Sequence, residues 1–378
     1  MQKSYKITVG IVVLIVVVIF LSTSNNKTPT GPIKIGVSTM LTGDWAALGN
    51  NIVNAAKLAV TDINDSGGIN GRKIELTIED SGLDSKSGLS AAQKLIDVDG
   101  IRYVIGGTSS NGTMAAAPIA NQSHSIYMTP VTGGSNIDNA GEYIFRTANS
   151  DLLAGHDLAE AALGLGYKKI VTITEVTEYT IDIDKSFEAI INGGNNPIVL
   201  SEQFQPGTTD FRTIVAKVRA VNPDAILVLS QTGTGGAYFI KQARQAGISA
   251  HILTDFTFIA NGDTKKILSS FEGIYFADPA YNVNSTTSKT FFARYKEKYA
   301  TDSLIPFHAA STYDSIMMLA DALRAVGDNS QKVHDWLLTN IKNWTGLMGT
   351  YSLDDKGNSN LGFIIKVIKN GNGVPVTY

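Results

Sequence analysis

The sequence predicts an α/β fold built from two doubly wound parallel-sheet lobes. Three observations support this prediction. The chain has 378 residues, which is more than a single hydrophobic core usually organises. Short apolar segments rich in β-branched residues alternate with amphipathic helical segments, as they do in parallel sheets covered on both faces. The alternation then begins again in the middle of the chain, which indicates a second sheet.

The first half contains four predicted strands separated by helices. Apolar residues at spacings of three and four mark the helices, and short apolar or alternating runs mark the strands. The strands are predicted at residues 33–37, 74–78, 103–105 and 126–128, and the helices at 48–63, 85–98 and 113–120.

The second half repeats this pattern and then changes character. Strands are predicted at 169–174, 198–204, 225–229, 251–254 and 273–276, with helices at 183–191, 211–220 and 237–246. Three more helices follow, at 290–299, 309–326 and 331–341. The chain is predicted to close with a β-hairpin of residues 347–353 and 361–368 around a turn at 354–357.

The N-terminal segment has the layout of a secretory signal. Lys3 and Lys6 precede an apolar run from Val9 to Leu21, and small polar residues follow it. Residues 1–24 are therefore either a cleaved signal peptide or a short uncleaved membrane anchor. Residues 25–32 form a Pro- and Gly-containing linker. Both alternatives place the rest of the chain outside the cytoplasm.

Composition excludes several classes of site. The chain has no cysteine, so disulfides, thiolate metal sites and a catalytic thiol are excluded. The formal net charge of -3 gives no basic footprint for nucleic acid. The five histidines show no metal-binding spacing, and no glycine-rich phosphate motif is complete. We therefore expect no metal and no cofactor.

Five motifs, in order along the chain, resemble those of the leucine/isoleucine/valine-binding protein family. They include the loop Leu-Thr-Gly-Asp-Trp and the turn Asn-Asp-Ser-Gly-Gly-Ile-Asn-Gly, and the resemblance runs from about residue 33 to residue 367. The motifs occupy residues 41–49, 62–71, 103–110, 145–151 and 349–357.

The resemblance implies a periplasmic binding protein of type I, whose two lobes are joined by a three-strand hinge. Lobe 1 would comprise residues 33–148 and 277–345, and lobe 2 residues 149–276 and 346–378. The implied function is that of an extracytoplasmic, monomeric protein that binds an amino acid, of the branched-chain type or a similar small polar solute. Its implied partner is the permease of an ABC importer.

The first lobe supplies three of the site residues that the resemblance implies. Ser110 follows a predicted strand and precedes a helix, where its hydroxyl and the free N–H groups of the helix start suit a carboxylate. Simple helix capping by Ser109 or Ser110 is the alternative interpretation. Val131 and Thr132 would offer a carbonyl and a hydroxyl to the ligand, although the family's hydroxyl falls nearer Gly133 by direct counting.

The remaining site residues lie on both sides of the predicted cleft. Tyr179 matches a tyrosine that closes over the ligand, and Asp255 lies one position before the family's ammonium-binding acid. Asp255 could equally cap a helix or turn. Trp45 would form a wall of the side-chain pocket. Gln231 follows a second-lobe strand, and its neighbour Thr232 replaces a family tyrosine, which suggests a more polar ligand.

Two other functions compete with solute binding for transport. The sequence Gly107-Thr108-Ser109-Ser110-Asn111 narrowly misses the Gly-x-Ser-x-Gly elbow of α/β hydrolases, because Asn111 replaces the last glycine. No second motif places a histidine near this serine, so an enzyme is the remote alternative. A ligand-binding sensor of the same fold is the nearer alternative.

Overall fold

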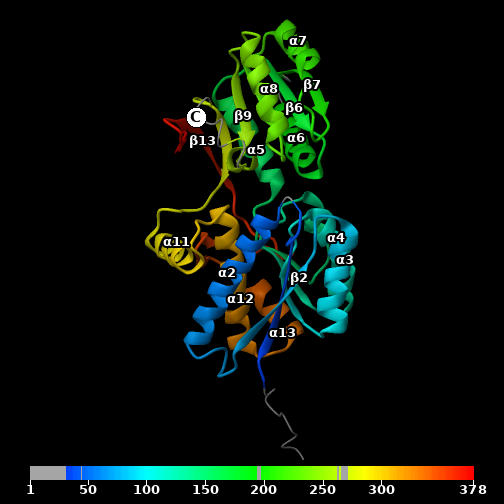
Figure 1. The fold of residues 1–378 in the computed structure, drawn as a ribbon, viewed down its shortest axis with the longest axis vertical. Coiled ribbons are helices and arrows are strands. Elements are labelled where there is room, and N and C mark those ends of the chain that lie inside the picture. The colour runs from blue at the N-terminus through cyan, green and yellow to red at the C-terminus, as the bar shows by residue number, and fades with distance from the viewer. Residues whose placement is uncertain (1–30, 44, 194–196, 262–263, 265–270) are drawn as a thin grey trace, which may run out of the picture.

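The computed structural model describes residues 31–378 except 44, 194–196, 262–263 and 265–270. The predicted signal peptide or anchor, and all but the last two residues of the predicted linker, lie outside the described residues. The described chain forms two lobes stacked along the long axis of the molecule (Figure 1). No helix in this part of the chain combines the length and apolar character that crossing a membrane requires.

The lower lobe in Figure 1 contains a five-stranded parallel sheet in the order β2-β1-β3-β4-β5. Its strands are β1 (Ile33–Thr39), β2 (Ile74–Asp80), β3 (Tyr103–Gly106), β4 (Ile126–Thr129) and β5 (Ile144–Arg146). Its helices are α2 (Ala46–Asp65), α3 (Ser85–Ala92), the π-helix η1 (Gln93–Val98), α4 (Ser110–Gln122), the 3-10 helix η2 (Ser135–Asn139), α11 (Thr286–Tyr299), α12 (Pro306–Val326) and α13 (Ser330–Asn340).

Helices cover both faces of this sheet, as its apolar strands require. Helices α2 and α12 pack against each other on one face, while α3 and α4 pair on the other. The helix predicted at 85–98 differs in one respect, because its last six residues form a π-helical turn. That turn keeps Leu95 and Ile96 in the core.

The upper lobe contains a seven-stranded sheet in the order β14-β13-β10-β9-β8-β6-β7. Its strands are β6 (Ile170–Glu175), β7 (Ile198–Phe204), β8 (Ala225–Leu229), β9 (His251–Asp255), β10 (Tyr275–Pro279), β13 (Phe363–Lys369) and β14 (Asn372–Pro375). Its helices are α5 (Asp151–Gly164), α6 (Glu178–Ile191), α7 (Arg212–Val221), α8 (Thr234–Gln245) and α9 (Phe256–Ala260).

This second sheet is mixed rather than wholly parallel. The five strands from β7 to β10 run parallel, whereas β13 and β14 are antiparallel additions at one edge. Helices α5 and α6 cover one face, and α7 and α8 cover the other. Both lobes thus have the doubly wound layering that the sequence predicts.

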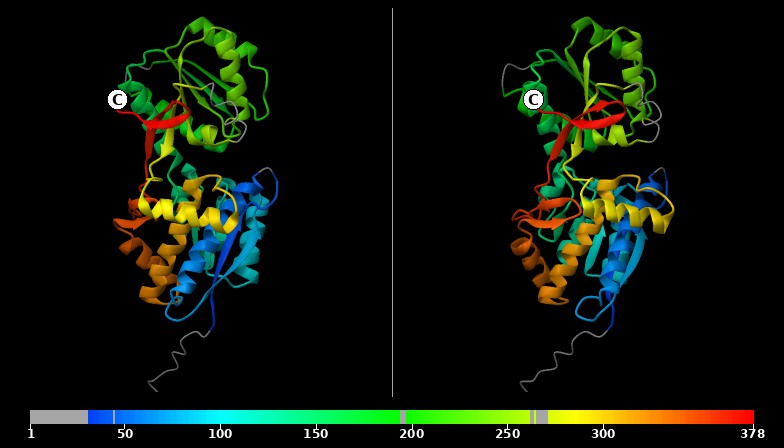
Figure 2. Two further views of the ribbon diagram at one scale, coloured as in Figure 1. Left: turned by 60° about the vertical axis from the view of Figure 1, so that its left-hand side comes forward. Right: turned by 90° about the vertical axis from the view of Figure 1, so that its left-hand side faces the viewer.

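The chain passes between the two sheets three times, at a narrow waist (Figure 2). It leaves the first lobe after β5, returns after β10, and crosses again between the small hairpin of β11 (Trp344–Gly346) and β12 (Gly349–Tyr351) and strand β13.

The hairpin predicted from residues 347–353 and 361–368 is wrong. Strand β12 pairs with β11, whereas β13 pairs with β10 and β14. The first arm contacts residues just before the second arm, through a bridge between Leu353 and Ser359 and through the Asn360 N–H, which donates to the Ser352 carbonyl at 3.1 Å. The arms diverge because each buries its apolar residues in a different core: Tyr351 and Leu361 belong to the first lobe's core, and Ile365 to the second's. This packing favours a return to lobe 2 after Leu361 rather than at residue 346.

Candidate functional site

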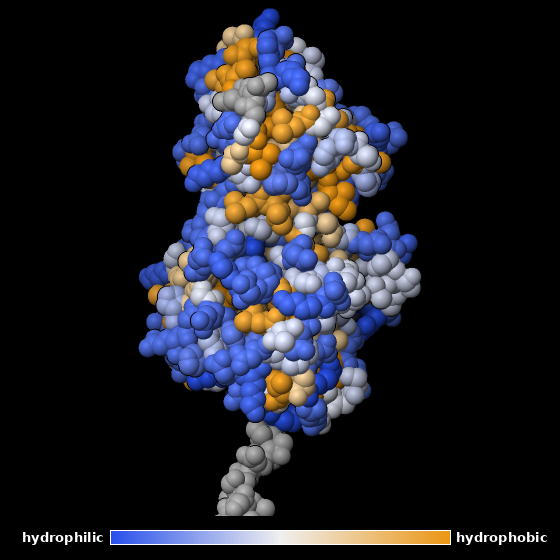
Figure 3. All heavy atoms as spheres, turned by 180° about the vertical axis from the view of Figure 1, so that it is seen from behind, coloured by the Kyte–Doolittle hydropathy of each residue, from blue (hydrophilic) through white to orange (hydrophobic). Residues whose placement is uncertain are grey.

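A cavity of about 790 Å³ lies between the lobes at the ends of their parallel strands. Most of its lining comes from the loops and helix starts that follow β1, β3 and β4 in one sheet and β6, β8 and β9 in the other. This is the position in which open α/β sheets bind ligands. On the far side of the molecule, apolar side chains gather along the waist between the lobes (Figure 3).

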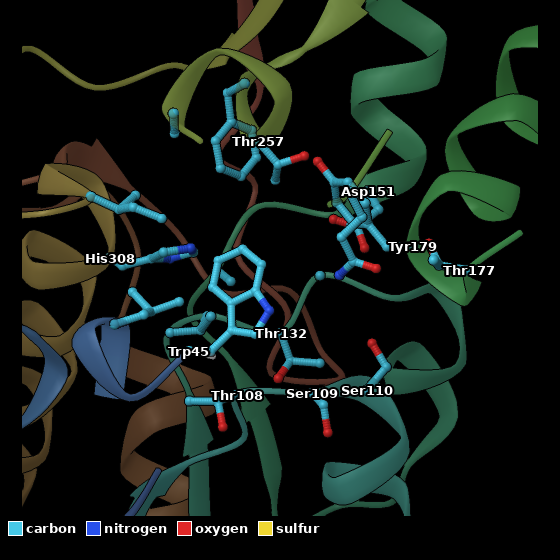
Figure 4. Close-up of a pocket in the computed structure, with 18 of the residues that line it drawn as sticks. Trp45, Thr108, Ser109, Ser110, Thr132, Asp151, Thr177, Tyr179, Thr257 and His308 are labelled. Atoms are coloured by element: carbon cyan, nitrogen blue, oxygen red, sulfur yellow. The ribbon is translucent and has the colours of Figure 1, made fainter. Parts of the chain in front are cut away.

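Ser110 lies in the cavity wall and is free of capping. The cap of α4 is Ser109, whose hydroxyl accepts from the Gly112 N–H at 3.1 Å and donates to the Leu83 carbonyl at 2.7 Å. The Ser110 hydroxyl, half-buried, makes no hydrogen bond to any described residue (Figure 4). The first N–H groups of α4 also lack intrahelical acceptors. Together they can hold an anionic group.

Val131 and Thr132 also line the cavity, but the Thr132 hydroxyl is engaged within the first lobe. It donates to the Gly107 carbonyl, and Thr132 is only 3% exposed. Its proton is therefore not available to a carboxylate, and its remaining lone pair suits a donor such as an ammonium.

Asp151, the first residue of α5, is the site residue that sequence reasoning missed. A side chain at Gly133 would place its Cβ 2.2 Å from Asp151 Oδ1, so the carboxylate lies directly against this glycine. The Asp151 N–H donates to the Gly133 carbonyl at 2.8 Å and fixes the contact. The carboxylate lines the cavity and accepts no hydrogen bond from any described residue. Asp151 ends the motif at residues 145–151, but an acid that begins a helix usually serves the helix itself, so the sequence does not indicate a ligand-binding role for it.

The surroundings of Asp151 favour a bound cation. Burial raises the pKa of its carboxyl well above the ordinary value, and Arg146 only partly offsets this effect. Nearby acidic groups raise that pKa further: Asp182, Asp255 and Glu178. A cationic group beside Asp151 would lower the pKa again and stabilise the charged carboxylate.

Asp255 is close to this acid but does not line the cavity. It caps α9, accepting from the Thr257 N–H at 2.7 Å and from the Thr257 hydroxyl. It also accepts from the Tyr179 hydroxyl at 3.1 Å, and it is fully buried. Tyr179 itself lines the cavity and packs edge-on against Phe256, the position that direct counting gave for the family's acid. In the structure Asp255 therefore caps a helix, which is the alternative role that the sequence allowed for it.

Gln231 and Thr232 both line the cavity. The polar groups of Thr232 are bound to a buried acid, however: its N–H and hydroxyl donate to Glu175 at 2.9 and 2.6 Å. The replacement of a family tyrosine by Thr232 is thus explained by contacts inside the second lobe and does not by itself indicate a polar ligand.

The apolar end of the cavity lies away from the hydroxyls and acids. Trp45, at the start of α2, occupies the middle of the view in Figure 4. Leu304, Ile305 and Phe307, from the loop before α12 and its first turn, also line the cavity. His308 follows them, and sequence reasoning missed it as a site residue; its one visible signal is that it is the only ionisable residue in the apolar run that follows Leu304.

Two further hydrogen bonds join the lobes beside the cavity. The Ser135 N–H donates to Asp182 Oδ2 at 2.9 Å, and the Asn136 amide donates to Glu178 Oε1 at 2.5 Å. Both donors lie in the first lobe and both acceptors on α6 of the second. Hydrogen bonding by Asn136 partly offsets the increase that burial and Asp182 cause in the pKa of Glu178.

The described lining of the cavity contains acids but neither lysine nor arginine. Within the described residues, no group of three or more histidine and acidic side chains is arranged to hold a metal ion. The site thus offers neutral donors on one wall and carboxylates on the other.

Comparisons of this chain with known proteins agree on one family. A model of the periplasmic binding protein family matches residues 32–372. The Leu/Ile/Val-binding protein homolog 3 of Brucella melitensis biotype 1 is 30% identical over 223 residues, which are 58% of this chain and 60% of that protein. The match to this relative therefore spans less than two thirds of its length.

Two solved structures share the whole fold. LivJ, the branched-chain amino acid transporter substrate-binding protein from Streptococcus pneumoniae in complex with isoleucine, has a TM-score of 0.78 at 27% identity, covering 90% of this chain and 97% of that one. A solute-binding protein of an ABC transporter from R. palustris in complex with 4-hydroxybenzoate has a TM-score of 0.80 at 19% identity, covering 92% and 96%. At that identity the second likeness shows the fold alone.

Proposed function

The chain belongs to the periplasmic binding protein family, whose members are solute-binding proteins, and from this premise we propose that it binds an amino acid between its lobes. It holds the solute outside the cytoplasm and passes it, chemically unchanged, to the permease of an ABC importer. The amino-acid names of the relative and of the isoleucine-bound structure support this proposal.

The observation that carries the proposal is the pairing of the two cavity walls. An α-amino acid carries a carboxylate and an ammonium on one carbon atom. Ser110 and the start of α4 provide neutral donors for the first group. Asp151, buried and without a hydrogen-bonded partner for its carboxylate among the described residues, provides the charge for the second.

The same charge distribution argues against an aromatic acid such as the 4-hydroxybenzoate of the R. palustris structure. An anion without an ammonium would enter a cavity with two acids, Asp151 and Glu178, and with no basic side chain in its described lining. With no basic side chain to pair with it, its desolvated carboxylate would remain without a counter-charge, which is costly in a closed cleft. The zwitterion satisfies both walls at once.

Ligand contacts from both lobes would favour the closed form over the open one. Ser110 and the helix start belong to the first lobe, whereas Asp151 and Tyr179 belong to helices of the second. The solute would first bind the neutral donors of one lobe, and the acidic wall would then close over its ammonium.

Isothermal titration calorimetry of the purified mature protein tests the proposal. The ligands are the common L-amino acids, with 4-hydroxybenzoate and the deaminated acid of each amino acid that binds. We expect at least one amino acid to bind and its deaminated counterpart to lose most of the affinity. Binding of the aromatic acid together with no binding of any amino acid would overturn the proposal.

A further inference from the structure

His308 lies in the wall of the cavity opposite its acidic groups. It is the third residue of α12 and is only 5% exposed. Figure 4 shows its imidazole turned toward the cavity, across from Asp151, Tyr179 and Ser110. A ligand whose ammonium and carboxylate engage those three residues would extend its side chain toward His308.

The surroundings of His308 are aromatic and apolar. The centre of its ring lies 4.0 Å from that of Phe307 and 6.2 Å from that of Phe256. Burial lowers the pKa of the imidazole to about 3, and hydrogen bonding to the Pro130 carbonyl only partly offsets this effect. The ring is therefore neutral under all physiological conditions, and neutrality suits a group that recognises an uncharged side chain.

A neutral imidazole has one N–H and one bare nitrogen that accepts hydrogen bonds. The Pro130 carbonyl can only accept, so it favours the tautomer that carries the N–H on the nitrogen other than Nδ1 and leaves Nδ1 as the acceptor. Nδ1 is buried and has no hydrogen-bond partner among the described residues. Burial of a polar atom of this kind is unfavourable when nothing satisfies it. A ligand that covers this wall either supplies a donor or leaves the cost in place.

We propose that His308 determines specificity by accepting a hydrogen bond from the ligand's side chain, so that the site selects amino acids that carry a hydroxyl or amide donor there. The inference rests on the proposed binding of amino acids and narrows it. The preferred ligands are thus polar relatives of the branched-chain amino acids. The rest of this wall, including Leu304 and Ile305, provides the apolar surface that such side chains also need.

Pairs of amino acids with nearly equal shape test the inference. Asparagine and leucine form one pair, and threonine and valine form the other; the members of each pair differ chiefly in their polar atoms. Titration calorimetry of the wild-type protein should give about tenfold tighter binding of the polar member in at least one pair, the value expected for one neutral hydrogen bond.

Three variants separate this role from simple packing. His308→Phe keeps a ring in the same space and should abolish or reverse the preference. His308→Asn retains an acceptor and should keep it. His251→Gln, at the exposed start of β9, is the matched control and should leave every affinity unchanged.

A direct measurement covers the case in which the hydrophobic variant does not fold. Nitrogen-15 NMR of the wild-type imidazole should show the resonance of the bare nitrogen move on addition of the preferred ligand, as acceptance of a hydrogen bond requires. An unmoved resonance overturns the inference, and so does equal binding of both members of each pair. Equal binding leaves amino-acid binding itself intact, whereas no binding of any amino acid overturns the proposed function and this inference together.

Discussion

The two lobes present walls of opposite character to the same cavity. The first lobe offers neutral groups: the Ser110 hydroxyl, the amide groups at the start of α4 and the indole of Trp45. The second lobe offers acids, with Asp151 in the lining and Asp255 buried behind Tyr179. Under the proposed function each wall would bind one end of a zwitterion, so the difference between the lobes would make closure depend on a ligand that carries both charges.

The acids of the second lobe also differ from one another. Asp255 is saturated on Oδ1 by Thr257 and Tyr179, whereas Asp151 has no hydrogen-bonded partner for its carboxylate among the described residues. Proximity in space therefore does not give these two carboxylates the same role. Hydrogen bonds on Oδ1 hold Asp255 inside the wall, whereas Asp151 lines the cavity, where we propose that it binds the ligand.

The largest expected effect on ligand affinity comes from removing the charge of the acidic wall. Asp151→Asn keeps the shape of the side chain but removes the charge that would face the ammonium. We expect amino-acid affinity to fall by on the order of 2–5 kcal/mol, because the variant leaves a buried ammonium unpaired. Titration calorimetry provides the measurement, with Asp302→Asn, an exposed acid in the first lobe, as the control. Equal affinities in the two variants would show that Asp151 does not bind the ligand.

The next effect concerns the neutral wall. Ser110→Ala removes a hydroxyl that would donate to the ligand carboxylate and should weaken binding by about 1.5–3 kcal/mol. The matched control is its neighbour: Ser109→Ala removes the cap of α4 and should lower unfolding stability by about 1 kcal/mol. Calorimetric affinity and thermal unfolding of both variants separate the two roles. A loss of stability in Ser110→Ala with unchanged affinity would contradict the assignment.

A smaller effect depends on pH and concerns a buried acid inside the second lobe. Asp184 in the second lobe is buried, accepts from Thr174 at 2.6 Å and has its pKa raised by burial to about 6. The folded state therefore holds this proton more tightly than the unfolded chain, where the pKa is near 3.8. The contribution of Asp184 to stability is thus greatest below the lower value, and it falls as pH rises toward 6.

Asp184→Asn should remove this dependence. We expect the variant to gain about 1–2 kcal/mol over the wild type between pH 5 and pH 8, since a shift of about two units is worth at most about 3 kcal/mol. Urea unfolding at both pH values gives the comparison. Parallel pH profiles for the two proteins would show that burial of Asp184 is compensated in some other way.

The smallest effect concerns the contacts that join the lobes. Asp182→Ala removes the acceptor of the Ser135 N–H and should weaken the interlobe contact by about 1 kcal/mol. Small-angle scattering of the ligand-free variant should show a more extended average shape. Asp182→Asn, which keeps an acceptor, should resemble the wild type; identical scattering from all three proteins would rule out a role for this contact in closure.

Much of the fold follows from the sequence because its signals are local. Apolar runs and helical spacing placed the strands and most helices of both sheets close to their observed bounds, as for β7 and β8. The prediction of a closing hairpin was wrong because two apolar segments separated by a turn have the local pattern of a hairpin even when they pair with other strands. Their partners differ: Ile365 pairs with Ala277, which lies far away in the chain, whereas Tyr351 pairs with the nearby Trp344 in the first lobe.

The site was predictable only in part. Position after a parallel strand was enough to bring Trp45, Ser110, Val131, Tyr179 and Gln231 into the cavity lining. Which polar groups are free was not predictable, because that depends on contacts with residues distant in sequence. The Thr132 hydroxyl donates to the Gly107 carbonyl, and the Thr232 hydroxyl donates to the Glu175 carboxylate. No pattern in the sequence indicates either hydrogen bond.

The sequence by itself determined the two-lobed α/β architecture and the ends of the strands at which a ligand binds, because both follow from local periodicity and from the geometry of parallel sheets. Only the tertiary structure decided which acid faces the cavity. Asp151 lies against Gly133 in the cavity lining, whereas Asp255 is buried and accepts hydrogen bonds on Oδ1 from Tyr179 and Thr257. Hydrogen-bond satisfaction is settled by the whole fold, and with it the chemistry of the site.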